Sequence, residues 1–498
     1  MFSSGTVPAL EVIIPILAEI GLLALLLLVL ALDLFTRRRR AAGMVTGIGM
    51  LVILAATVAV GLLNVGRPEF QGSLLGGMLR YDMLALIFRS MLLAAGALTC
   101  FISLDVEGVG RSGEFFAIVI VATLGMNLMS ASADLVMLFI ALETTSISLY
   151  ILAGFLRDSR RSAEAGIKYY LFGAFTSGLL LYGLSLLFGY TSTTNLYNIA
   201  APLAEVFGRG AQGAFGVVVA LLLVLAGFAF KIAAVPFHFW TPDVYQGAPT
   251  PVTAFLSTAS KAASFALLVR VFDAVWPADV APYWVGLIAA ISVVTMTLGN
   301  LLALVQRNMK RMLAYSSIAQ AGYTLMGVVA LTSSDLGAAA VAFYMLMYVF
   351  TNILAFTVVI VVSNHVGTDE IKDFAQLGRR APYLALAMVL ALLSLGGVPP
   401  LAGFFGKFFL FAAAVQAGYV WLAIVGVLNA IVALYYYLTV IKVMYVDSNE
   451  DMTRITLTPA YGFVVVFSAV AIVVMGTLAS PWWNWALNAA SSLTAMTR

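Results

Sequence analysis

Histidine and cysteine are almost absent from this chain of 498 residues, which contains two histidines and one cysteine. A single thiol, Cys100, cannot form an internal disulfide or hold an iron–sulfur cluster. The two histidines, His238 and His365, are too few and too far apart to bind a haem pair or a metal by themselves. No glycine-rich phosphate or dinucleotide loop occurs in a strand–helix context. We therefore expect no cofactor, no metal and no redox chemistry in the chain itself.

Charged residues are also scarce, at 10% of the sequence, whereas 62% of the residues are hydrophobic. A soluble domain carries about 25% charged residues, so the composition predicts an all-α membrane protein. A membrane span needs about 20 apolar residues. The net charge of +3, without a basic stripe interleaved with aromatics, does not suggest nucleic-acid binding. We count about 14 candidate transmembrane helices: 12–36, 41–64, 82–104, 114–131, 133–156, 164–190, 213–246, 250–275, 283–304, 311–331, 336–363, 382–415, 418–446 and 459–480.

Basic residues gather in alternate loops between the predicted spans. Because basic loops face the cytoplasm and the number of spans is even, we expect both termini on the outer side. We expect the first apolar run, which contains Pro8 and Pro15, to be a retained span and not a cleaved signal. Arg37–Arg40 is predicted to be a stop-transfer flank, with a lipid-binding or nucleic-acid patch as the alternative. The basic loops contain the following residues: Arg37–Arg40, Arg157, Arg160, Arg161, Arg307, Lys310, Arg311, Lys372, Arg379 and Arg380.

A few ionisable side chains interrupt the apolar segments. Lys231, Lys261 and Lys407 lie inside spans, Lys168 lies at the edge of another, and Glu143 is the acid that accompanies them. A charge at the bilayer centre costs several kcal/mol and usually faces a protein interior or a water-filled path. Such residues in several separate spans indicate a route for protons across the membrane.

Two of these lysines lie beside prolines. Lys231 is followed by Pro236 and His238, and Pro399-Pro400 precedes Lys407. Proline removes a backbone donor and breaks a helix, and unwound backbone at membrane depth is tolerated only where protein or water satisfies it. The seventh and twelfth spans are therefore predicted to be discontinuous. The alternative is that they are simple proline kinks in a helical bundle.

Discontinuous helices at corresponding positions of two halves are typical of transporters with inverted repeats. Because the two breaks are five spans apart, we predict two inverted five-helix repeats, spans 4–8 and 9–13. The whole chain is then one polytopic membrane domain, residues 1–498. Its parts are the N-terminal spans (12–112), the first repeat (113–275), the second repeat (283–446) and the last span (459–480).

Each ionisable residue also has a structural interpretation. Glu143 could be a neutral, hydrogen-bonded carboxyl group. Glu164 and Lys168 are four residues apart, in the order that favours an ion pair on a helix surface. His238 either relays protons or hydrogen-bonds the exposed carbonyls of the helix break.

Other charged residues near the span ends suggest structural roles. Arg89 and Asp82, seven residues apart in the third span, are predicted to pair with each other across helix turns or to contact a neighbouring subunit. Asp33 and Arg270 lie near span ends, where long side chains can reach the interface.

At these motifs the chain resembles subunit N, the mitochondrial subunit 2 type, of proton-pumping NADH–quinone oxidoreductase (respiratory complex I). The resemblance covers nearly the whole sequence, and its most specific stretch is Trp240–Val252. Several long matches in the same order are stronger evidence than one short motif. The other matching stretches are the following: Ala18–Ile20, Ala141–Tyr150, Glu164–Tyr170, Phe228–His238, Ser257–Lys261, Lys310–Ser317 and Gly403–Phe408.

The resemblance implies an antiporter-like membrane subunit in which Glu143 and Lys231 form a coupled pair, Lys261 relays and Lys407 connects to the outer side. Lys168 and His238 are accessories by the same analogy. A lysine in a low-dielectric site loses its proton more easily, and an adjacent carboxylate restores it. Movement of Glu143 towards or away from Lys231 would therefore load or release a proton.

The resemblance also implies partners and a location. NADH, FMN, iron–sulfur clusters and quinone belong to partner subunits, and the redox energy released there drives the switch. The expected membrane neighbours are antiporter-like subunit M and small subunits such as K and J, in a bacterial inner (plasma) membrane. Subunit M has a glutamate in its twelfth span, so Lys407 favours subunit N.

Two related assignments remain open at the level of sequence. One is a subunit of a multisubunit Na⁺/H⁺ antiporter, which is driven by an ion gradient without a redox partner; the stretch Trp240–Val252 argues against it. The other is a subunit of a ferredoxin-driven or hydrogenase-type relative of complex I, which would use the same channel residues.

Overall fold

A computed structural model of the chain describes residues 14–35, 39–63, 72–110, 112–333, 336–448 and 453–494. Pro8 at the N-terminus, and Arg37 and Arg38 of the basic cluster, lie outside the described residues. The α-helices up to the middle of the chain are α2 (Leu17–Phe35), α3 (Arg39–Leu63), α4 (Met83–Ser103), α5 (Gly113–Ala131), α6 (Leu135–Ala153), α7 (Arg160–Thr191), α8 (Ala200–Gly208), α9 (Ala211–Ile232), α10 (Trp240–Gly247), α11 (Thr250–Phe255) and α12 (Lys261–Ala274). The remaining α-helices are α13 (Ala281–Leu304), α14 (Met309–Val329), α15 (Leu336–Val366), α16 (Leu377–Arg380), α17 (Pro382–Gly396), α18 (Ala402–Gln416), α19 (Val420–Tyr445), α20 (Pro459–Thr477) and α21 (Ala479–Thr494).

The prediction of an all-α membrane protein is confirmed. Twelve helices in the described part of the chain are long and apolar enough to cross a membrane, and α17 and α18 are shorter apolar helices. Helix α14 coincides with the tenth predicted span, but it contains polar residues such as Lys310, Arg311 and Gln320 and is not one of these twelve helices. Strands β1 (Gly72–Leu74) and β2 (Leu79–Tyr81) form a small antiparallel hairpin in which Gly72 pairs with Tyr81.

The helices are interrupted where the prolines predict it. Helix α9 ends at Ile232, and the chain becomes α-helical again only at Trp240. Helix α17 ends at Gly396, and α18 begins at Ala402. Gly397 ends α17 with φ +86°, a conformation that glycine adopts readily. A third irregularity, which the sequence did not suggest, is the π-helical turn η5 (Leu256–Ser260) immediately before Lys261; such turns often occur at functional sites.

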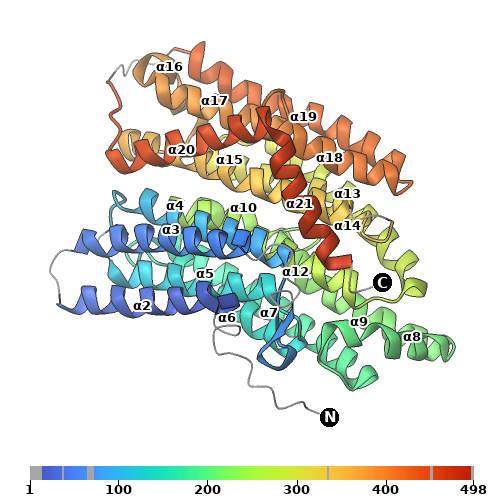
Figure 1. Cartoon of the computed structure of the whole chain (residues 1–498). Coiled ribbons are helices and arrows are strands. Elements are labelled where there is room, and N and C mark those ends of the chain that lie inside the picture. The colour runs from blue at the N-terminus through green and yellow to red at the C-terminus, as the bar shows by residue number, and fades with distance from the viewer. Residues whose placement is uncertain are drawn as a thin grey trace.

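Two helices form the centre of the molecule. Nearly all residues of α4 and α15 are buried, and these helices pack against each other and against α21. Figure 1 shows α21 crossing between the N-terminal spans and the second half of the chain. The amphipathic helix α21 was not predicted, because its sequence, rich in tryptophan, asparagine and serine, does not resemble a span.

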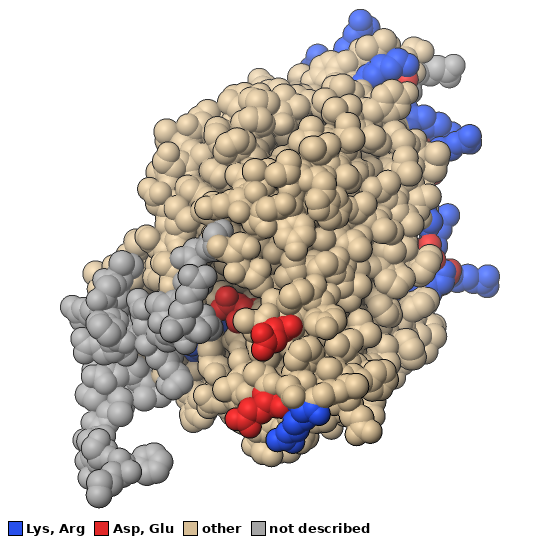
Figure 2. Space-filling model, turned by 90° about the vertical axis from the view of Figure 1, so that its right-hand side faces the viewer, with Lys and Arg blue, Asp and Glu red and all other residues tan. Residues whose placement is uncertain are grey.

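The outer helices expose large apolar side chains that a water-soluble protein would bury. Examples are Leu34 on α2, Phe175 on α7, Tyr435 on α19 and Val466 on α20. The face in Figure 2 is mostly uncharged, and many of the basic side chains in this view lie along one edge. An apolar surface of this extent fits contact with lipid and with neighbouring membrane proteins.

Candidate functional site

Lys231 lies in the last turn of α9, at the first helix break, and is buried. Its Nζ donates a hydrogen bond to Ser146 Oγ on α6. The rings of Phe230 and Tyr150 lie 5.4 and 5.7 Å from this nitrogen, measured to their centroids, within the range of a cation–π contact. The amine therefore lies among a hydroxyl group and two aromatic faces.

Glu143 lies on α6, three residues before Ser146, so both side chains project from one face of the helix. Ser177 of α7 donates a hydrogen bond to Glu143 Oε1 at 2.6 Å. Among the described side chains, no carboxylate oxygen lies within 4.0 Å of Lys231 Nζ. Glu143 therefore lies one turn of α6 away from Ser146, the residue that binds Lys231, and makes its own hydrogen bond to Ser177.

Lys261 follows the π-helical turn η5 and contacts α14. Its Nζ lies 2.5 Å from the carbonyl oxygen and 2.7 Å from the hydroxyl oxygen of Ser317. Tyr348 OH donates to the same hydroxyl at 2.8 Å, and Tyr245 OH lies 3.4 Å from it. Lys261 is thus fully surrounded by polar groups that are neutral.

The polar face of α14 continues beyond Ser317. Ser316 Oγ lies 2.5 Å from Tyr437 OH, and Gln320 Nε2 donates to the same Tyr437 oxygen at 3.3 Å. Tyr344 OH donates to Gln320 Oε1. Our sequence reasoning missed these residues because it followed charges only. The helical spacing of Ser316, Gln320 and Tyr323, which puts them on one face, could have indicated this polar face from the sequence.

Lys407 lies on α18, beyond the second helix break, and is buried. Its Nζ donates to the carbonyl oxygen of Gly396 at 3.1 Å and lies 4.6 Å from the centroid of the Tyr323 ring. A Cβ atom at Gly397 would lie 3.1 Å from Lys407 Cδ, so glycine leaves space for this side chain. The unwound backbone of the break thus supplies the acceptor for the amine.

Serine hydroxyl groups bind two of the buried amines, those of Lys231 and Lys261. A hydroxyl donates one hydrogen bond and accepts others, so it can take a proton on one side and release its own on the other. The amine of Lys407 instead contacts a carbonyl oxygen and the ring of Tyr323.

Lys168 belongs to an exposed ion-pair network. Its Nζ lies 2.7 Å from Glu164 and 2.6 Å from Asp243, and Arg311 lies 2.7 Å from the other oxygen of Asp243. The predicted contact between Glu164 and Lys168 is therefore present. A polar cavity of about 250 Å³ adjoins this network, with Gln246 in its lining.

His238 lies in the first helix break and is buried. Its Nδ1 has no hydrogen-bond partner within the described part of the chain. The ring centroid lies 4.4 Å from that of Phe239. A relay role for His238 remains a prediction.

The predicted pairing of Arg89 with Asp82 is wrong. Asp82 caps α4 by accepting a hydrogen bond from the amide of Ala85, so it turns away from the later turns of its helix. Arg89 instead forms a buried ion pair at 2.8 Å with Glu19 of α2, and it donates to the Pro15 carbonyl. Helix packing brings these partners together, which a search along one helix cannot detect.

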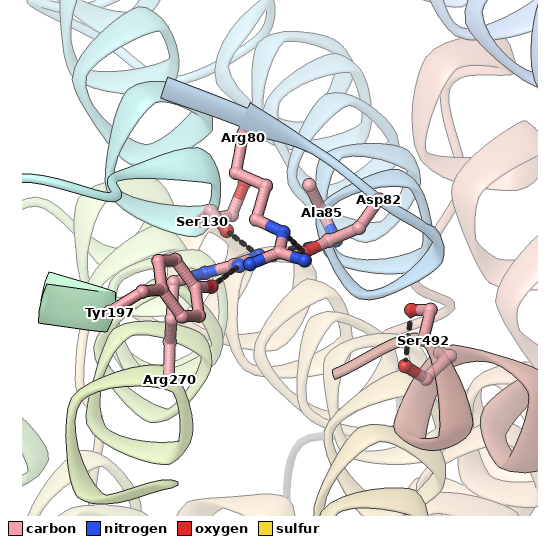
Figure 3. Close-up of polar contacts among 8 residues, drawn as sticks. Arg80, Asp82, Ala85, Ser130, Tyr197, Arg270 and Ser492 are labelled. Atoms are coloured by element: carbon pink, nitrogen blue, oxygen red, sulfur yellow. Dashed lines mark hydrogen bonds and ion pairs between the residues drawn. The ribbon is translucent and has the colours of Figure 1, made fainter. Parts of the chain in front are cut away.

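The prediction that Arg270 reaches the interface is also wrong, because its side chain is completely buried. Both terminal nitrogens of its guanidinium group contact the carboxylate of Asp82, at 2.7 and 2.9 Å. Tyr197 OH and the Ser130 carbonyl accept further hydrogen bonds, and Arg80 lies over the Tyr197 ring (Figure 3). Four hydrogen bonds to three polar partners make burial of the Arg270 charge tolerable.

The described residues contain no group of three or more histidine, cysteine, aspartate or glutamate side chains that could hold a metal ion. Cys100 is buried and has no disulfide partner.

A multi-pass helical bundle with buried lysines beside broken helices defines an antiporter-like membrane protein. Residues 132–433 match the family described as NADH:quinone oxidoreductase/Mrp antiporter, transmembrane. The chain belongs to this family and, within it, to the subunit N group. It is 46% identical over 474 residues to NADH-quinone oxidoreductase subunit N of Moorella thermoacetica, with 95% of each chain covered.

Solved structures show the same fold. A chain of respiratory complex I from Thermus thermophilus superposes with a TM-score of 0.78 at 33% identity, covering 94% of this chain and 98% of that one. A chain of the membrane-bound sulfane sulfur reductase, an archaeal respiratory membrane complex, gives a TM-score of 0.83 at 26% identity, with 99% of both chains covered. The fold therefore occurs in more than one kind of respiratory complex.

Proposed function

We propose that the chain is the proton-translocating, antiporter-like subunit of a redox-driven NADH–quinone oxidoreductase. The observation that carries the proposal is the burial of Lys231, Lys261 and Lys407 inside the bundle, each held by neutral polar or aromatic groups in a different part of it. An arrangement of this kind stabilises a charged amine only weakly, so the amine can gain and lose a proton during turnover.

In this proposal Lys231 is the loading site and Glu143 is the movable charge. Glu143 now contacts Ser177, and a change of side-chain rotamer would bring it towards Ser146 and Lys231. Its approach favours the protonated amine, and its withdrawal releases the proton towards Lys261. Lys407, beyond the second break, passes the proton to the outer side.

Lys168 and His238 have accessory roles in the proposal. The acidic partners of Lys168, Glu164 and Asp243, line the polar cavity beside α10, where protons arrive from the side of the basic loops. His238, with one ring nitrogen unpaired, lies in the break that follows Lys231 and could orient water there.

The proposal places the redox chemistry in partner subunits, which hold NADH, FMN, iron–sulfur clusters and quinone. The chain works as one member of a multisubunit complex, beside antiporter-like subunit M and small subunits such as K and J. It lies in the inner (plasma) membrane of a bacterium, with both termini outside. The 46% identity to a subunit N supports this setting.

The proposed working units are the two inverted repeats, residues 113–275 and 283–446, with the spans of 12–112 and 459–480 outside them. The helix breaks at α9–α10 and α17–α18 support this division. A superposition of the two units by a rotation about an axis in the membrane plane would test it, and failure to superpose would contradict it.

The test of the proposed function uses the whole complex, carrying Glu143→Gln or Lys231→Ala, in sealed vesicles. Both variants should abolish or sharply reduce NADH-driven proton uptake. Quinone reduction should also slow, because electron transfer is coupled to pumping. Correctly assembled variants that pump at the normal proton-to-electron ratio would refute the proposal. Pumping that requires Na⁺ and proceeds without a reductant would favour the multisubunit Na⁺/H⁺ antiporter instead.

A further inference from the structure

A second cavity, of about 630 Å³, opens on the side of the basic loops between α13, α19 and the short helix η7 (Ile371–Phe374). At about 30 Å³ for each molecule, it has room for on the order of 20 waters. None of the residues assigned above to the proton path lines it. Its polar lining includes Gln306, Arg307, Glu370, Lys372, Tyr436 and Asp447.

The cavity penetrates deeply into the bundle. Tyr436, in its wall, lies nine residues before the end of α19 at Tyr445. At 1.5 Å per residue this corresponds to roughly 14 Å along the helix, about half of the hydrocarbon thickness of a bilayer. Water in the cavity can therefore approach the middle of the membrane from one side.

Polar groups continue from the cavity wall towards Lys407. Tyr436 OH donates to Asn300 Oδ1 at 3.2 Å, and Asn300 Nδ2 donates to Tyr323 OH at 3.0 Å. The ring of Tyr323 is the one that lies 4.6 Å from Lys407 Nζ. An amide does not relay protons, so Asn300 holds the two hydroxyl groups in position for water.

The same tyrosine adjoins the groups that lead to Lys261. The ring centroids of Tyr436 and Tyr437 are 4.4 Å apart. Tyr437 OH lies 2.5 Å from Ser316 Oγ, and Ser316 precedes Ser317, which binds Lys261. Tyr436 is therefore the point at which the cavity meets polar groups close to both Lys261 and Lys407.

We propose that this cavity is a second proton inlet, which supplies Lys407 directly from the side of the basic loops, with Tyr436 as its positioning residue. The inference rests on the proposed function and adds an inlet in the second half of the chain, through which protons reach Lys407 without passing Lys231. Tyr436 accepts a proton from cavity water while its own proton leaves towards the water held by Asn300 and Tyr323, so no net charge remains on it.

The first experiment blocks the cavity. In a Cys100→Ala background, Val443→Cys places a thiol in the cavity lining, and Val446→Cys places one three residues further on, outside the lining and 69% exposed. Complexes in sealed vesicles receive a charged, membrane-impermeant methanethiosulfonate on the basic-loop side. Modification of Val443→Cys should lower that variant's own proton uptake by the share that enters through the cavity, whereas modification of Val446→Cys should leave its uptake unchanged.

The second experiment removes one hydroxyl group. Tyr436→Phe should slow proton uptake, whereas Tyr445→Phe, the same change at a half-exposed position on the same helix, should not. The inference is overturned if fully modified Val443→Cys pumps as before, or if Tyr436→Phe pumps like Tyr445→Phe. Either result would leave the proposed function intact, because that function fails only if Glu143→Gln and Lys231→Ala pump normally.

Discussion

Lys231 and Lys407 each lie beside a helix break, but their surroundings differ. Lys231 precedes its break and contacts the hydroxyl group of Ser146, and Glu143 lies one turn of α6 away from that serine. Lys407 follows its break and has a backbone carbonyl and an aromatic ring as neighbours. A carboxylate can move and so switch the charge of the first amine, whereas the dipoles around the second are fixed. Movement of the carboxylate can therefore change the protonation of Lys231, whereas Lys407 can only respond to protons that reach it.

The two halves also differ in the polar contacts that join their helices. In the first half, the buried ion pair of Asp82 and Arg270 links α4 to α12. In the second half, Asn300 joins α13 to α19 through hydrogen bonds to Asn429, with no charge involved. Charged contacts thus dominate the first half, and neutral contacts dominate the second.

The largest effect is expected from arginine at either lysine. Lys231→Arg and Lys407→Arg keep the positive charge, but a guanidinium does not release its proton in proteins. Loss of a positioned proton-transfer group costs on the order of 10²-fold or more, so both variants should nearly stop proton uptake by the complex in vesicles. Lys442→Arg, an exposed lysine on α19, is the control. Normal pumping by Lys407→Arg alone would show that the second lysine acts only as a fixed charge.

The next largest effect is expected at the ion pair of the first half. Asp82→Asn leaves the buried guanidinium of Arg270 without its charge partner, and Arg270→Gln leaves Asp82 with only the more distant Arg80, at 3.5 Å. Loss of one partner of a buried ion pair costs about 3–5 kcal/mol. The double variant should lose less than the sum of the two single variants. The measurements are the yield of assembled complex and the midpoint of its thermal denaturation. Additive losses would mean that the two side chains contribute independently.

A smaller effect is expected in the second half. Asn300→Leu leaves the buried hydroxyl groups of Tyr323 and Tyr436 without this partner, at about 1–3 kcal/mol. The denaturation midpoint should therefore fall less than it does for either single variant of the ion pair. A loss as large as that of Arg270→Gln would remove the contrast between charged and neutral contacts.

The smallest effect is expected at the exposed network. Both Lys168 and Asp243 have side chains that are 38% exposed, and such ion pairs contribute about 1 kcal/mol or less. Lys168→Ala should leave assembly intact and reduce proton uptake less than any change at Lys231. Abolished pumping in an assembled Lys168→Ala complex would make this residue an obligatory carrier.

Features that depend on local sequence could be predicted. Proline interrupts a helix wherever it occurs in its interior, so Pro236 and Pro399-Pro400 marked the two breaks. The spacing of Glu164 and Lys168 marked their contact in the same way. Burial of Lys231, Lys261 and Lys407 followed from the cost of exposing a charge to lipid.

Features that depend on helix packing could not be predicted. The partner of Asp82 is 188 residues away, and a buried arginine near a span end has the same sequence pattern as one that reaches the interface. The groups that surround Lys261 and Lys407 come from α14, α15 and α19, whose neighbours are set by the tertiary fold. Tyr435, Tyr436 and Tyr437 are identical in type, yet only the bundle determines that Tyr435 is exposed, that Tyr435 and Tyr436 line a cavity and that Tyr437 is internal.

The ion pair of Asp82 and Arg270 also has a consequence for evolution. A lineage that replaces Asp82 alone leaves the charge of Arg270 in the protein interior without a carboxylate, so selection should remove that intermediate. The two positions are therefore expected to covary as one inherited unit despite their distance in the gene. Relatives that lack the aspartate should also lack the arginine, and recombination between divergent copies of the gene should fail when the crossover separates them.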